Sequence, residues 1–450
     1  MGKILDWLFG SDDQKQKPAK PAYSGTSTWA SRYDPKVAKT SLAAASSTAS
    51  SLKPIVDPKR ISMVKAHTII GSIEKYGRAS EFGNLVTWLE ANEASVAKKV
   101  LDDKTPHLNS LHLAVRPAAP GGCLAYGPGC FGSLKPNGTV YVLGDTHGDL
   151  ESLVATFDTI IDLAKNKDDF EPTVYLLGDI LDRNTEGCMH ECVFLLAILQ
   201  KALPKQFERY NKIKLGIIKG DHDVALSYDE KTKKFKSSVS PADYCDWLNE
   251  RIDLNKGLED ATWIGRAWIH LMDECPAAAF LEGPGALLTH GGIPRSDIQE
   301  KILTVPYFVQ GKECETDFAW CRMVDAKNKL LNRASKTSEI GFQEFEALNN
   351  NIFFGKIKKF IFAHQHPAKG FQRLDKFYPG YDVMCISSFR ADDTLGGPTV
   401  PYFCKVDATE VNVYSMSPAA YVVRLEENSI EHSKAASTTV IPTSTPAAKA

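Results

Sequence analysis

Aspartate and histidine residues gather in five short motifs, each of which directly follows a short apolar run. Carboxylate and imidazole groups together suit borderline divalent metals such as Mn, Fe, Zn and Co, and the lack of cysteine in the motifs argues against a structural zinc site. Burying unpaired aspartate and histidine costs free energy that a bound cation would offset. The motifs are Gly144-Asp145-Thr146-His147-Gly148-Asp149, Gly178-Asp179-Ile180-Leu181-Asp182-Arg183, Gly220-Asp221-His222-Asp223, His290-Gly291-Gly292 and Ala363-His364-Gln365-His366.

A donor set of this size can hold two ions. One carboxylate can bridge two metals about 3.5–4 Å apart, and such a pair clamps a phosphoryl group and generates hydroxide from water near neutral pH. The glycines beside the donors allow the backbone to approach metals and substrate closely. The motifs therefore favour metal-assisted phosphoryl chemistry.

Strands must position these motifs, because each apolar run ends where a motif begins. Helical stretches at Leu150–Lys165 and Thr185–Leu203 alternate with the runs, and this alternation is typical of an α/β architecture. Open α/β sheets bind ligands outside the carboxyl ends of their strands, which is where the motifs lie. The predicted strands are Val140–Leu143, Val174–Leu177, Leu215–Ile218, Ala286–Leu288 and Phe360–Ala363.

Composition divides the chain into four parts. Residues 1–60 are rich in Ser, Ala and Thr and hold ten Lys or Arg against five Asp, so we predict a flexible arm. Residues 61–135 combine a helical segment, with apolar residues three and four apart, and a Gly/Pro-rich loop from Arg116 to Lys135. Residues 136–425 form the domain that carries the motifs, and residues 426–450 a disordered tail.

An apolar patch, residues 4–9, lies inside the predicted arm. Two interpretations stay open for it. The patch docks on the chain's own domain, as frayed ends do, or it contacts a partner or a membrane surface as a short amphipathic anchor.

Composition and charge exclude several classes of protein. Lys plus Arg is 53 and Asp plus Glu is 55, and the resulting net charge of -2 excludes a strongly basic nucleic-acid binder. The chain has no run of 18 apolar residues, so we predict no transmembrane segment. Its ten cysteines are sparse and irregularly spaced, which favours reduced thiols and a cytoplasmic location.

In this order the five motifs resemble those of the calcineurin-like metallophosphoesterase superfamily and, within it, of the PPP-type serine/threonine protein phosphatases. Those enzymes carry GDxHG, GDxVDRG, GNHE, HGG and a late RAHQ or GH motif. The stretches at 178–183 and 288–293 are the most specific, and the resemblance covers roughly residues 138–410. It implies an α/β fold in which a metallophosphoesterase β-sandwich is flanked by helices and holds a dimetal centre at its strand ends.

The resemblance also implies a role for each motif residue. His222 would be the general acid that protonates the leaving alkoxide, oriented by Asp182, and Arg183 would bind phosphate oxygens with its planar guanidinium. The two ions are expected to be divalent Mn, with Fe or Zn as alternatives. Asp145 and His147 would hold the first ion, Asp179 would bridge both, and Asp221, His290 and His364 would hold the second.

Three positions depart from the PPP pattern. Asp221 stands where the family has Asn, which adds a negative charge beside the second ion and removes an amide donor. Asp223 replaces the usual Glu. His366 follows His364 by two residues, and the wider superfamily uses such a histidine to complete the shell of the first metal, so we expect that role here. The alternative is a histidine that lies outside the metal shell.

The family also carries a second phosphate-binding arginine downstream of the HGG motif. Arg333 lies at a suitable distance after Trp320, and Arg390 falls where the family has a loop that lines the active-site cleft. We rank Arg333 first and Arg390 second as substrate-binding residues. The alternative for each is a solvated surface arginine.

The resemblance therefore implies a dimetal-dependent phosphoprotein phosphatase. A metal-bridging hydroxide would attack the phosphorus of a Ser, Thr or Tyr phosphomonoester directly, without a phosphoenzyme, and the partner would be a phosphorylated protein. Two alternatives stay open. One is a small-molecule phosphoesterase, such as a dinucleoside-polyphosphate hydrolase or a phosphodiesterase. The other is a non-catalytic scaffold that uses its metal site or its tails to hold a partner.

Overall fold

The predicted arm and tail, and residues 61–77 of the predicted helical segment, lie outside the part of the chain that the structure describes. The computed structural model describes residues 78–102, 131–134, 139–164, 171–254, 258–281, 283–299, 312–328, 338–351, 353, 355–367, 370–374, 376–378, 380–390, 401–408, 411–416 and 422–425.

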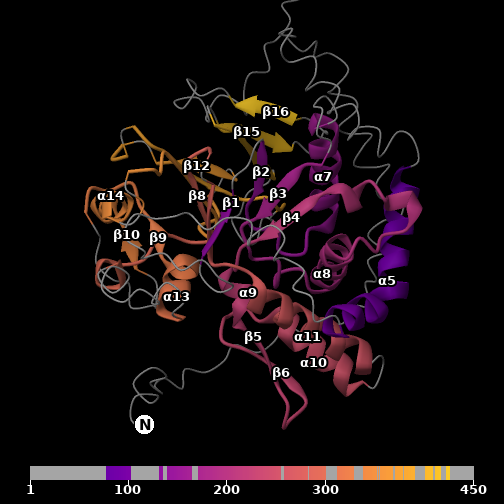
Figure 1. Cartoon of the computed structure of the whole chain (residues 1–450). Helices are drawn as coiled ribbons and strands as arrows, with labels where there is room; N and C mark the ends of the chain where they lie inside the picture. The colour runs from indigo at the N-terminus through magenta and orange to yellow at the C-terminus, as the bar shows by residue number, and fades with distance from the viewer. Residues whose placement is uncertain are drawn as a thin grey trace, which may run out of the picture. The chain divides into compact units, whose positions relative to one another are not determined.

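Two six-stranded sheets carry the motif loops (Figure 1). The first runs in the order β1 (Phe131–Leu134), β7 (Ala278–Leu281), β8 (Ala286–Thr289), β11 (Lys359–Phe362), β13 (Asp382–Ile386), β12 (Phe371–Arg373). The second runs in the order β16 (Val422–Leu425), β15 (Val411–Met416), β14 (Tyr402–Val406), β2 (Val140–Leu143), β3 (Thr173–Leu176), β4 (Lys214–Ile217).

Strands that precede motifs run parallel within each sheet. Strands β2, β3 and β4 are parallel neighbours, and so are β8, β11 and β13. Strand β14, from late in the chain, pairs antiparallel with β2 and places Phe403 opposite Leu143. Parallel neighbours end at the same edge, so each sheet gathers its motif loops at one edge.

The two sheets pack face to face. Side chains on a strand point to its two faces in turn, so alternate residues of β2 and β11 show which faces of the two sheets meet. Val140 and Val142 join Ile361 in one buried cluster between the sheets. Phe360 and Phe362 point the other way. The β-sandwich implied by the motifs is therefore confirmed.

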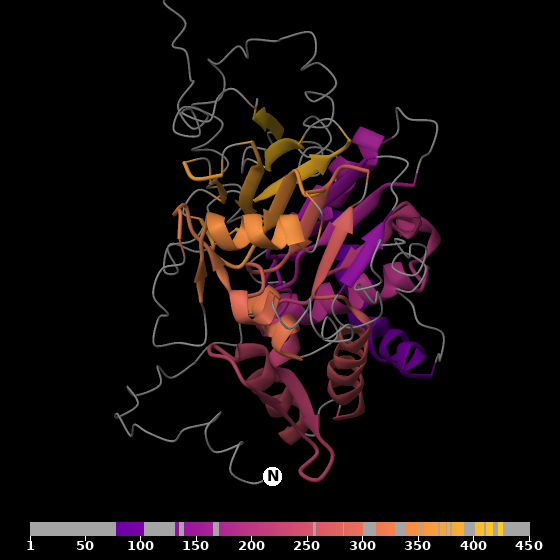
Figure 2. The same ribbon diagram turned by 60° about the vertical axis from the view of Figure 1, so that its left-hand side comes forward.

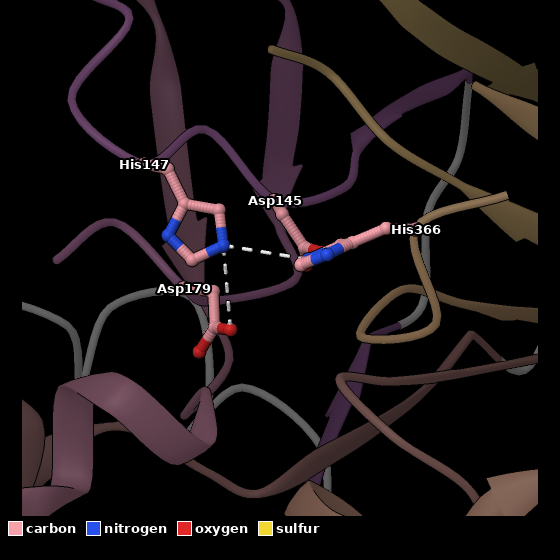
Figure 3. A group of neighbouring side chains, drawn as sticks. All are labelled: Asp145, His147, Asp179 and His366. Carbon is pink, nitrogen blue, oxygen red and sulfur yellow. Dashed lines mark hydrogen bonds and ion pairs between the residues drawn. The ribbon is translucent and has the colours of Figure 1, made fainter. Parts of the chain in front are cut away.

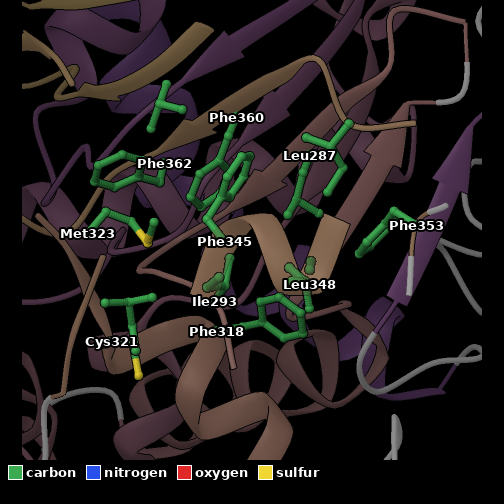
Figure 4. Close-up of a cluster of buried hydrophobic side chains, with 14 of the residues drawn as sticks. Leu287, Ile293, Phe318, Cys321, Met323, Phe345, Leu348, Phe353, Phe360 and Phe362 are labelled. Atoms are coloured by element: carbon green, nitrogen blue, oxygen red, sulfur yellow. The ribbon is translucent and has the colours of Figure 1, made fainter. Parts of the chain in front are cut away.

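Helices cover the outer faces of the sandwich. Helices α7 and α8 lie beside β2–β4, while α13 and α14 lie on the side of β8 (Figures 1 and 2). Phe318, Phe345 and Leu348 of these last two helices pack against Phe360 and Phe362 (Figure 4). The helices are α5 (Arg78–Asp102), α7 (Leu150–Ala164), α8 (Thr185–Leu199), α9 (Asp221–Ala225), α10 (Asp243–Asp253), α11 (Leu258–Glu274), α13 (Lys312–Trp320) and α14 (Phe342–Asn351).

Helix α5 lies in the segment predicted to be helical and docks against α8 and α11. Its apolar residues at three- and four-residue spacings, Phe82, Leu85 and Leu89 among them, are buried. Polar contacts also join it to the domain. The Glu93 carboxylate accepts from Arg251 at 2.9 Å, and the Val96 carbonyl oxygen accepts from the Gln200 amide at 3.0 Å.

One sequence expectation is wrong. The Gly/Pro-rich stretch to Lys135 was expected to be a loop throughout, yet Phe131–Leu134 forms strand β1. Strand β1 pairs parallel with β7, and Gly132 lies opposite Ala279. Tertiary pairing overrides the weak strand propensity of glycine at this position.

Two further strand pairs complete the described part of the chain. A hairpin of β5 (Leu226–Asp229) and β6 (Lys234–Ser237) follows the third motif, and a short pair of β9 (Arg322–Met323) and β10 (Glu339–Ile340) follows the fourth. The first pair projects away from both sheets in Figures 1 and 2.

Candidate metal centre

The motif loops meet closely because two glycines allow their backbones to touch. Gly178 has a φ of +97°, and a Cβ there would lie 2.3 Å from the backbone nitrogen of Gly220. A Cβ on Gly220 would in turn lie 2.2 Å from the backbone nitrogen of Asp179. Any side chain would force these loops apart. The two glycines therefore set the separation of Asp179 and Asp221.

Asp223 ties the same loops together. Its carboxylate accepts from the backbone amides of Asp179 at 2.7 Å, Ile180 at 3.1 Å and Gly220 at 3.2 Å. A buried carboxylate that accepts several amide hydrogen bonds fixes the backbone that donates them. Asp223, which replaces the usual Glu, thus positions the loop that carries Asp179.

A first cluster of donors forms where the first, second and fifth motifs meet (Figure 3). The ligand atoms of Asp145, His147, Asp179 and His366 all lie within 4.8 Å of one another. The His366 Nε2 atom lies 2.7 Å from Asp145 Oδ2 and 3.4 Å from His147 Nε2. In Figure 3, dashed lines join one nitrogen of the His147 ring to Asp179 and to His366. The structure thus brings His366 into the same group as Asp145 and His147.

A second cluster shares Asp179 with the first. It contains Asp179, Asp221, His290 and His364, whose ligand atoms also lie within 4.8 Å of one another. Asp221 Oδ1 lies 2.9 Å from His290 Nε2 and 3.0 Å from His364 Nδ1. Ligand atoms around one ion with bonds of about 2.0–2.2 Å lie roughly 3–3.5 Å apart. The spacing of this cluster therefore matches a single ion.

The histidine tautomers suit metal ligands. The His147 Nδ1–H group donates to the Leu181 carbonyl oxygen at 2.8 Å, and the His290 Nδ1–H group donates to the Leu177 carbonyl oxygen at 2.9 Å. In both rings Nε2 then faces the cluster. Metal-binding histidines usually donate their other ring N–H to a carbonyl or carboxylate in this way.

Burial and charge show that a cation fits. Asp145, Asp179 and Asp221 are at most 3% exposed, although three carboxylates in one place repel one another. Burial opposes ionisation of Asp221, but His364 and His290 outweigh it and hold the pKa of Asp221 well below its ordinary value. Burial lowers the pKa of His147 well below its ordinary value, which keeps its imidazole neutral. Ionised carboxylates and a neutral imidazole are the forms that bind metals.

The backbone of the motif loops is strained. Asp179, Asp182 and Arg183 have φ values of 52°, 68° and 70°, and His364 and His366 have values of 64° and 41°. Such left-handed conformations cost of order 1–3 kcal/mol each for residues other than glycine and cluster at functional sites. The surrounding sheets supply the packing that offsets this cost.

A histidine–aspartate pair lies beside the two clusters. His222 Nδ1 lies 2.5 Å from Asp182 Oδ2, and Asp182 Oδ1 accepts from the Tyr244 backbone amide at 2.9 Å. Burial disfavours the charged imidazole. The charge of Asp179 and the hydrogen bond to Asp182 outweigh burial, and they raise the pKa of His222 to about 9. A protonated imidazole in this position is able to donate a proton at neutral pH.

The three arginines named from the sequence have different surroundings. Arg183 lies at the first cluster, with Nη2 3.5 Å from His366 Nδ1 and a buried Nε that has no hydrogen-bond partner in the described part of the chain. The Arg390 guanidinium pairs with Asp149 at 2.6 Å and Glu151 at 2.7 Å. Arg333 lies outside the described residues. The substrate-binding roles of Arg333 and Arg390 stay predictions.

The sequence did not predict the roles of several residues that contact the clusters or hold the motif loops and the following helix in place. The Phe389 ring packs against His147, and Gln365 hydrogen-bonds the backbone of Met323 at 2.7 and 3.0 Å. Asn184, one residue after Arg183, caps helix α8 by accepting from the Gly187 amide at 3.1 Å. Only Asn184 had a local signal, because Asn is a preferred N-cap before a helical run.

None of the described helices is long and apolar enough to cross a lipid bilayer. No match was found among curated proteins.

Several solved structures resemble this chain at low identity. A serine/threonine phosphatase from Saccharomyces cerevisiae with similarity to human phosphatase PP5 is 16% identical, with a TM-score of 0.44 over 70% of this chain and 82% of that one. A cold-active protein-tyrosine phosphatase from a Shewanella species is 14% identical, with a TM-score of 0.39 over 68% and 85%. A putative diadenosine tetraphosphatase is 13% identical, with a TM-score of 0.30 over 66% and 97%.

The family comparison covers the motif-bearing region directly. The sequence model for calcineurin-like phosphoesterases matches residues 138–368, half of the chain. That span contains every member of the two clusters as well as the His222–Asp182 pair. The chain therefore belongs to the calcineurin-like phosphoesterase family.

Proposed function

We propose that this protein is a dimetal-dependent phosphoprotein phosphatase that hydrolyses phosphomonoesters directly. The observation that carries the proposal is the sharing of Asp179 by two buried carboxylate–imidazole clusters. A shared carboxylate is what a pair of neighbouring ions requires. Asp145, His147 and His366 would hold the first ion with Asp179, and Asp221, His290 and His364 would hold the second.

The residues of the two clusters would hold the ions in a buried site. Ions bound there would supply positive charge for the phosphoryl oxygens and would lower the pKa of bound water to near neutrality. Mn²⁺ suits the mixed oxygen and nitrogen donor set, as do Fe and Zn ions.

Arg183 would bind and orient the phosphate. Its guanidinium lies beside the first cluster, and its buried Nε has no hydrogen-bond partner in the described part of the chain. A planar guanidinium offers paired donors that match two phosphate oxygens. The unpaired donor therefore supports an anionic group as the ligand of this arginine.

His222 would donate the proton that the leaving group needs. Its Nδ1–H group is held by Asp182, so Nε2 is the atom that delivers a proton. Serine and threonine alkoxides are poor leaving groups and require protonation, whereas activated phenolates require less. The His222–Asp182 pair thus favours phosphomonoesters of alkyl alcohols, which are the esters of phosphoserine and phosphothreonine.

The experiment compares substrate classes on one preparation. Protein stripped of metal with a chelator is titrated with Mn²⁺ and assayed on phosphoserine, phosphothreonine and phosphotyrosine peptides, diadenosine tetraphosphate and bis-p-nitrophenyl phosphate. We expect metal-dependent release of phosphate from the phosphopeptides at the highest kcat/KM. The Asp317→Asn variant, which changes a buried carboxylate that pairs with Arg295 and belongs to neither cluster, should show the substrate preference of the wild type.

Other results would replace the proposal. Faster cleavage of diadenosine tetraphosphate or of the diester would establish a small-molecule phosphoesterase. Metal binding without turnover of any of these substrates would establish a non-catalytic scaffold.

A further inference from the structure

The segment Ser387–Arg390 lies over the first motif, and Phe389 within it has no part in the chemistry proposed above. It follows strand β13, and its backbone is bound to that motif. The Ser388 amide donates to the Asp145 carbonyl oxygen at 2.9 Å, and the Ser388 hydroxyl accepts from the Gly144 amide at 2.8 Å. The same hydroxyl donates to the Tyr402 carbonyl oxygen. Ser388 therefore fixes this segment to the loop that carries Asp145.

Arg390 fixes the other end of the segment. Its Nη2 and Nε atoms donate to the two carboxylate oxygens of Asp149 at 2.6 and 3.0 Å, and its backbone amide donates to the same carboxylate at 2.8 Å. Glu151 adds a contact at 2.7 Å. Two guanidinium hydrogen bonds and one backbone hydrogen bond to the same carboxylate hold an arginine more firmly than a single contact does. The residue between Ser388 and Arg390 is thus held from both sides.

That residue is Phe389, and its ring contacts two of the proposed ligands. Its side chain is 4% exposed. The ring centre lies 5.0 Å from that of His147 and 5.4 Å from that of His366, and both contacts are edge to face. The two imidazoles lie 5.3 Å apart, also edge to face. The three rings therefore pack as one group, which leaves each imidazole little room to rotate.

The two histidines differ in how else they are held. His147 donates its Nδ1–H group to the Leu181 carbonyl oxygen. The His366 ring contacts Asp145, His147, Arg183 and Phe389, and its side chain is 20% exposed. The orientation of His366 therefore depends more on Phe389 than that of His147 does.

We propose that Phe389 is a positioning residue for the first metal ion. Held between Ser388 and the Arg390–Asp149 pair, its ring keeps the His366 imidazole turned toward Asp145 and His147. The inference rests on the metal centre of the proposed function. It assigns a specific task to a residue that touches neither substrate nor metal.

Metal binding by the full-length apo protein tests this role. Calorimetric titration with Mn²⁺ should show two ions bound to the wild type. Phe389→Ala should weaken one of the two sites by 10- to 100-fold, the range typical when a residue that orients a metal ligand is lost, and leave the other unchanged. Phe389→Leu, which keeps apolar volume without a ring edge, should show a smaller loss at the same site. Phe389→Tyr should bind both ions as the wild type does.

A control and a double variant separate positioning from general stability. Phe353 is as buried as Phe389, at 3% exposed, and packs 5.1 Å from Phe280 away from the clusters. Phe353→Ala should lower the melting temperature of the apo protein without changing Mn²⁺ affinity. If Phe389 acts through His366, the double variant Phe389→Ala/His366→Ala should bind Mn²⁺ no more weakly than His366→Ala alone.

The measurement of Mn²⁺ binding requires no substrate, so its outcome is separate from that of the phosphatase assay. A protein that hydrolyses no phosphate ester but loses one Mn²⁺ site in Phe389→Ala would support the inference while overturning the proposed function. Wild-type affinity at both sites in Phe389→Ala and Phe389→Leu would overturn the inference, as would additive losses in the double variant.

Discussion

The Nδ1 atom of His222 lies 2.5 Å from the Oδ2 atom of Asp182, on the opposite side of the imidazole from the nitrogen that would face a leaving group. This contact fixes which nitrogen is available for proton transfer. Because Asp182 also accepts from the Tyr244 amide, the carboxylate itself is held in place. Asp182 therefore holds the His222 imidazole in one orientation.

Replacing His222 should slow the reaction by removing the proton donor, without lowering the metal content. Loss of a general acid typically costs 10²–10⁴-fold in rate. His222→Asn should show a loss of that size on phosphoserine peptides and a smaller loss on p-nitrophenyl phosphate, whose phenolate leaves without much help. Metal content, measured by atomic emission, should stay at two ions. Equal losses on both substrates would contradict the role of His222.

Replacing Asp179 should affect both ions. Since Asp179 is the member shared by the two clusters, Asp179→Asn should lower bound metal below two ions per chain. Turnover should fall by more than the 10- to 100-fold typical of residues that only orient a metal ligand. Asp317→Asn is the matched control, because it changes a buried carboxylate outside the clusters. A variant that keeps two ions and near-normal turnover would mean that Asp179 does not join them.

The charge of Asp221 should strengthen metal binding and weaken the binding of a phosphate substrate. A carboxylate about 4–5 Å from a phosphate charge repels it by about 3–4 kcal/mol at an effective dielectric near 20. The same charge strengthens binding of a cation beside His290 and His364. Asp221→Asn should therefore raise the Mn²⁺ concentration needed for activity and, at saturating Mn²⁺, lower KM or raise kcat.

Activity against Mn²⁺ concentration, with KM measured at the plateau, checks the Asp221 prediction. Unchanged metal dependence together with unchanged plateau kinetics would show that Asp221 is not a ligand of the second ion.

Gln365 should matter for stability as well as for the site. Its side chain accepts from the Met323 amide at 2.7 Å and donates to the Met323 carbonyl oxygen at 3.0 Å, which anchors the loop between His364 and His366. Gln365→Leu leaves both backbone groups unpaired and should cost about 1–3 kcal/mol for each group left buried. Gln365→Glu keeps the acceptor and should lose less. Urea unfolding of the apo proteins measures both effects, and equal stability of the two variants would contradict this account.

His190 should make stability depend on pH. Burial lowers the pKa of His190 to about 4; the charge of Glu186 opposes this shift, and the charge of Arg251 adds a smaller effect in the same direction as burial. The unfolded chain takes up this proton near pH 6.5, so it binds more protons than the folded chain between pH 6.5 and 4. The stabilising contribution of neutral His190 is therefore full above pH 6.5 and is lost as the pH falls toward 4.

The size of the His190 effect follows from the two pKa values. Between pH 7.5 and 4.5 the wild type should lose about 2–3 kcal/mol more than His190→Gln. Urea unfolding at both pH values gives this difference. The variant of the half-buried His270, His270→Gln, should follow the wild type. A His190→Gln variant with the full wild-type pH dependence would show that the pKa of His190 is the same in the folded and unfolded states.

Local signals account for the parts of the fold that the sequence predicted. Strand β2 has the predicted bounds Val140–Leu143, and β3 and β4 begin one residue before their predicted starts. Each is a run of apolar, partly β-branched residues followed by Gly-Asp or a nearby glycine, which are signals that act over a few residues. The α/β class and the β-sandwich were predictable for this reason.

Contacts between distant residues account for what the sequence did not reveal. The pairing of β14 with β2 joins residues far apart in the chain, and so do the Asp149–Arg390 and His147–Phe389 contacts. No spacing rule relates such residues, since only the completed sheets bring them together. The identity of the motif residues could be predicted, whereas the side chains that hold them in place could not.

The late arrival of strand β14 has a consequence during protein synthesis. At about 5–20 residues per second, a ribosome takes roughly 15–50 s to travel from Leu143 to Tyr402. Throughout that interval one edge of β2 lacks its native neighbour, and an unpaired strand edge is a template for pairing with other chains. Asp145 lies directly after this strand, and His366 has not been made for most of the same period. The free edge of β2 is therefore open to such pairing until β14 has been made, and the donors for the first ion are complete only once His366 has been made.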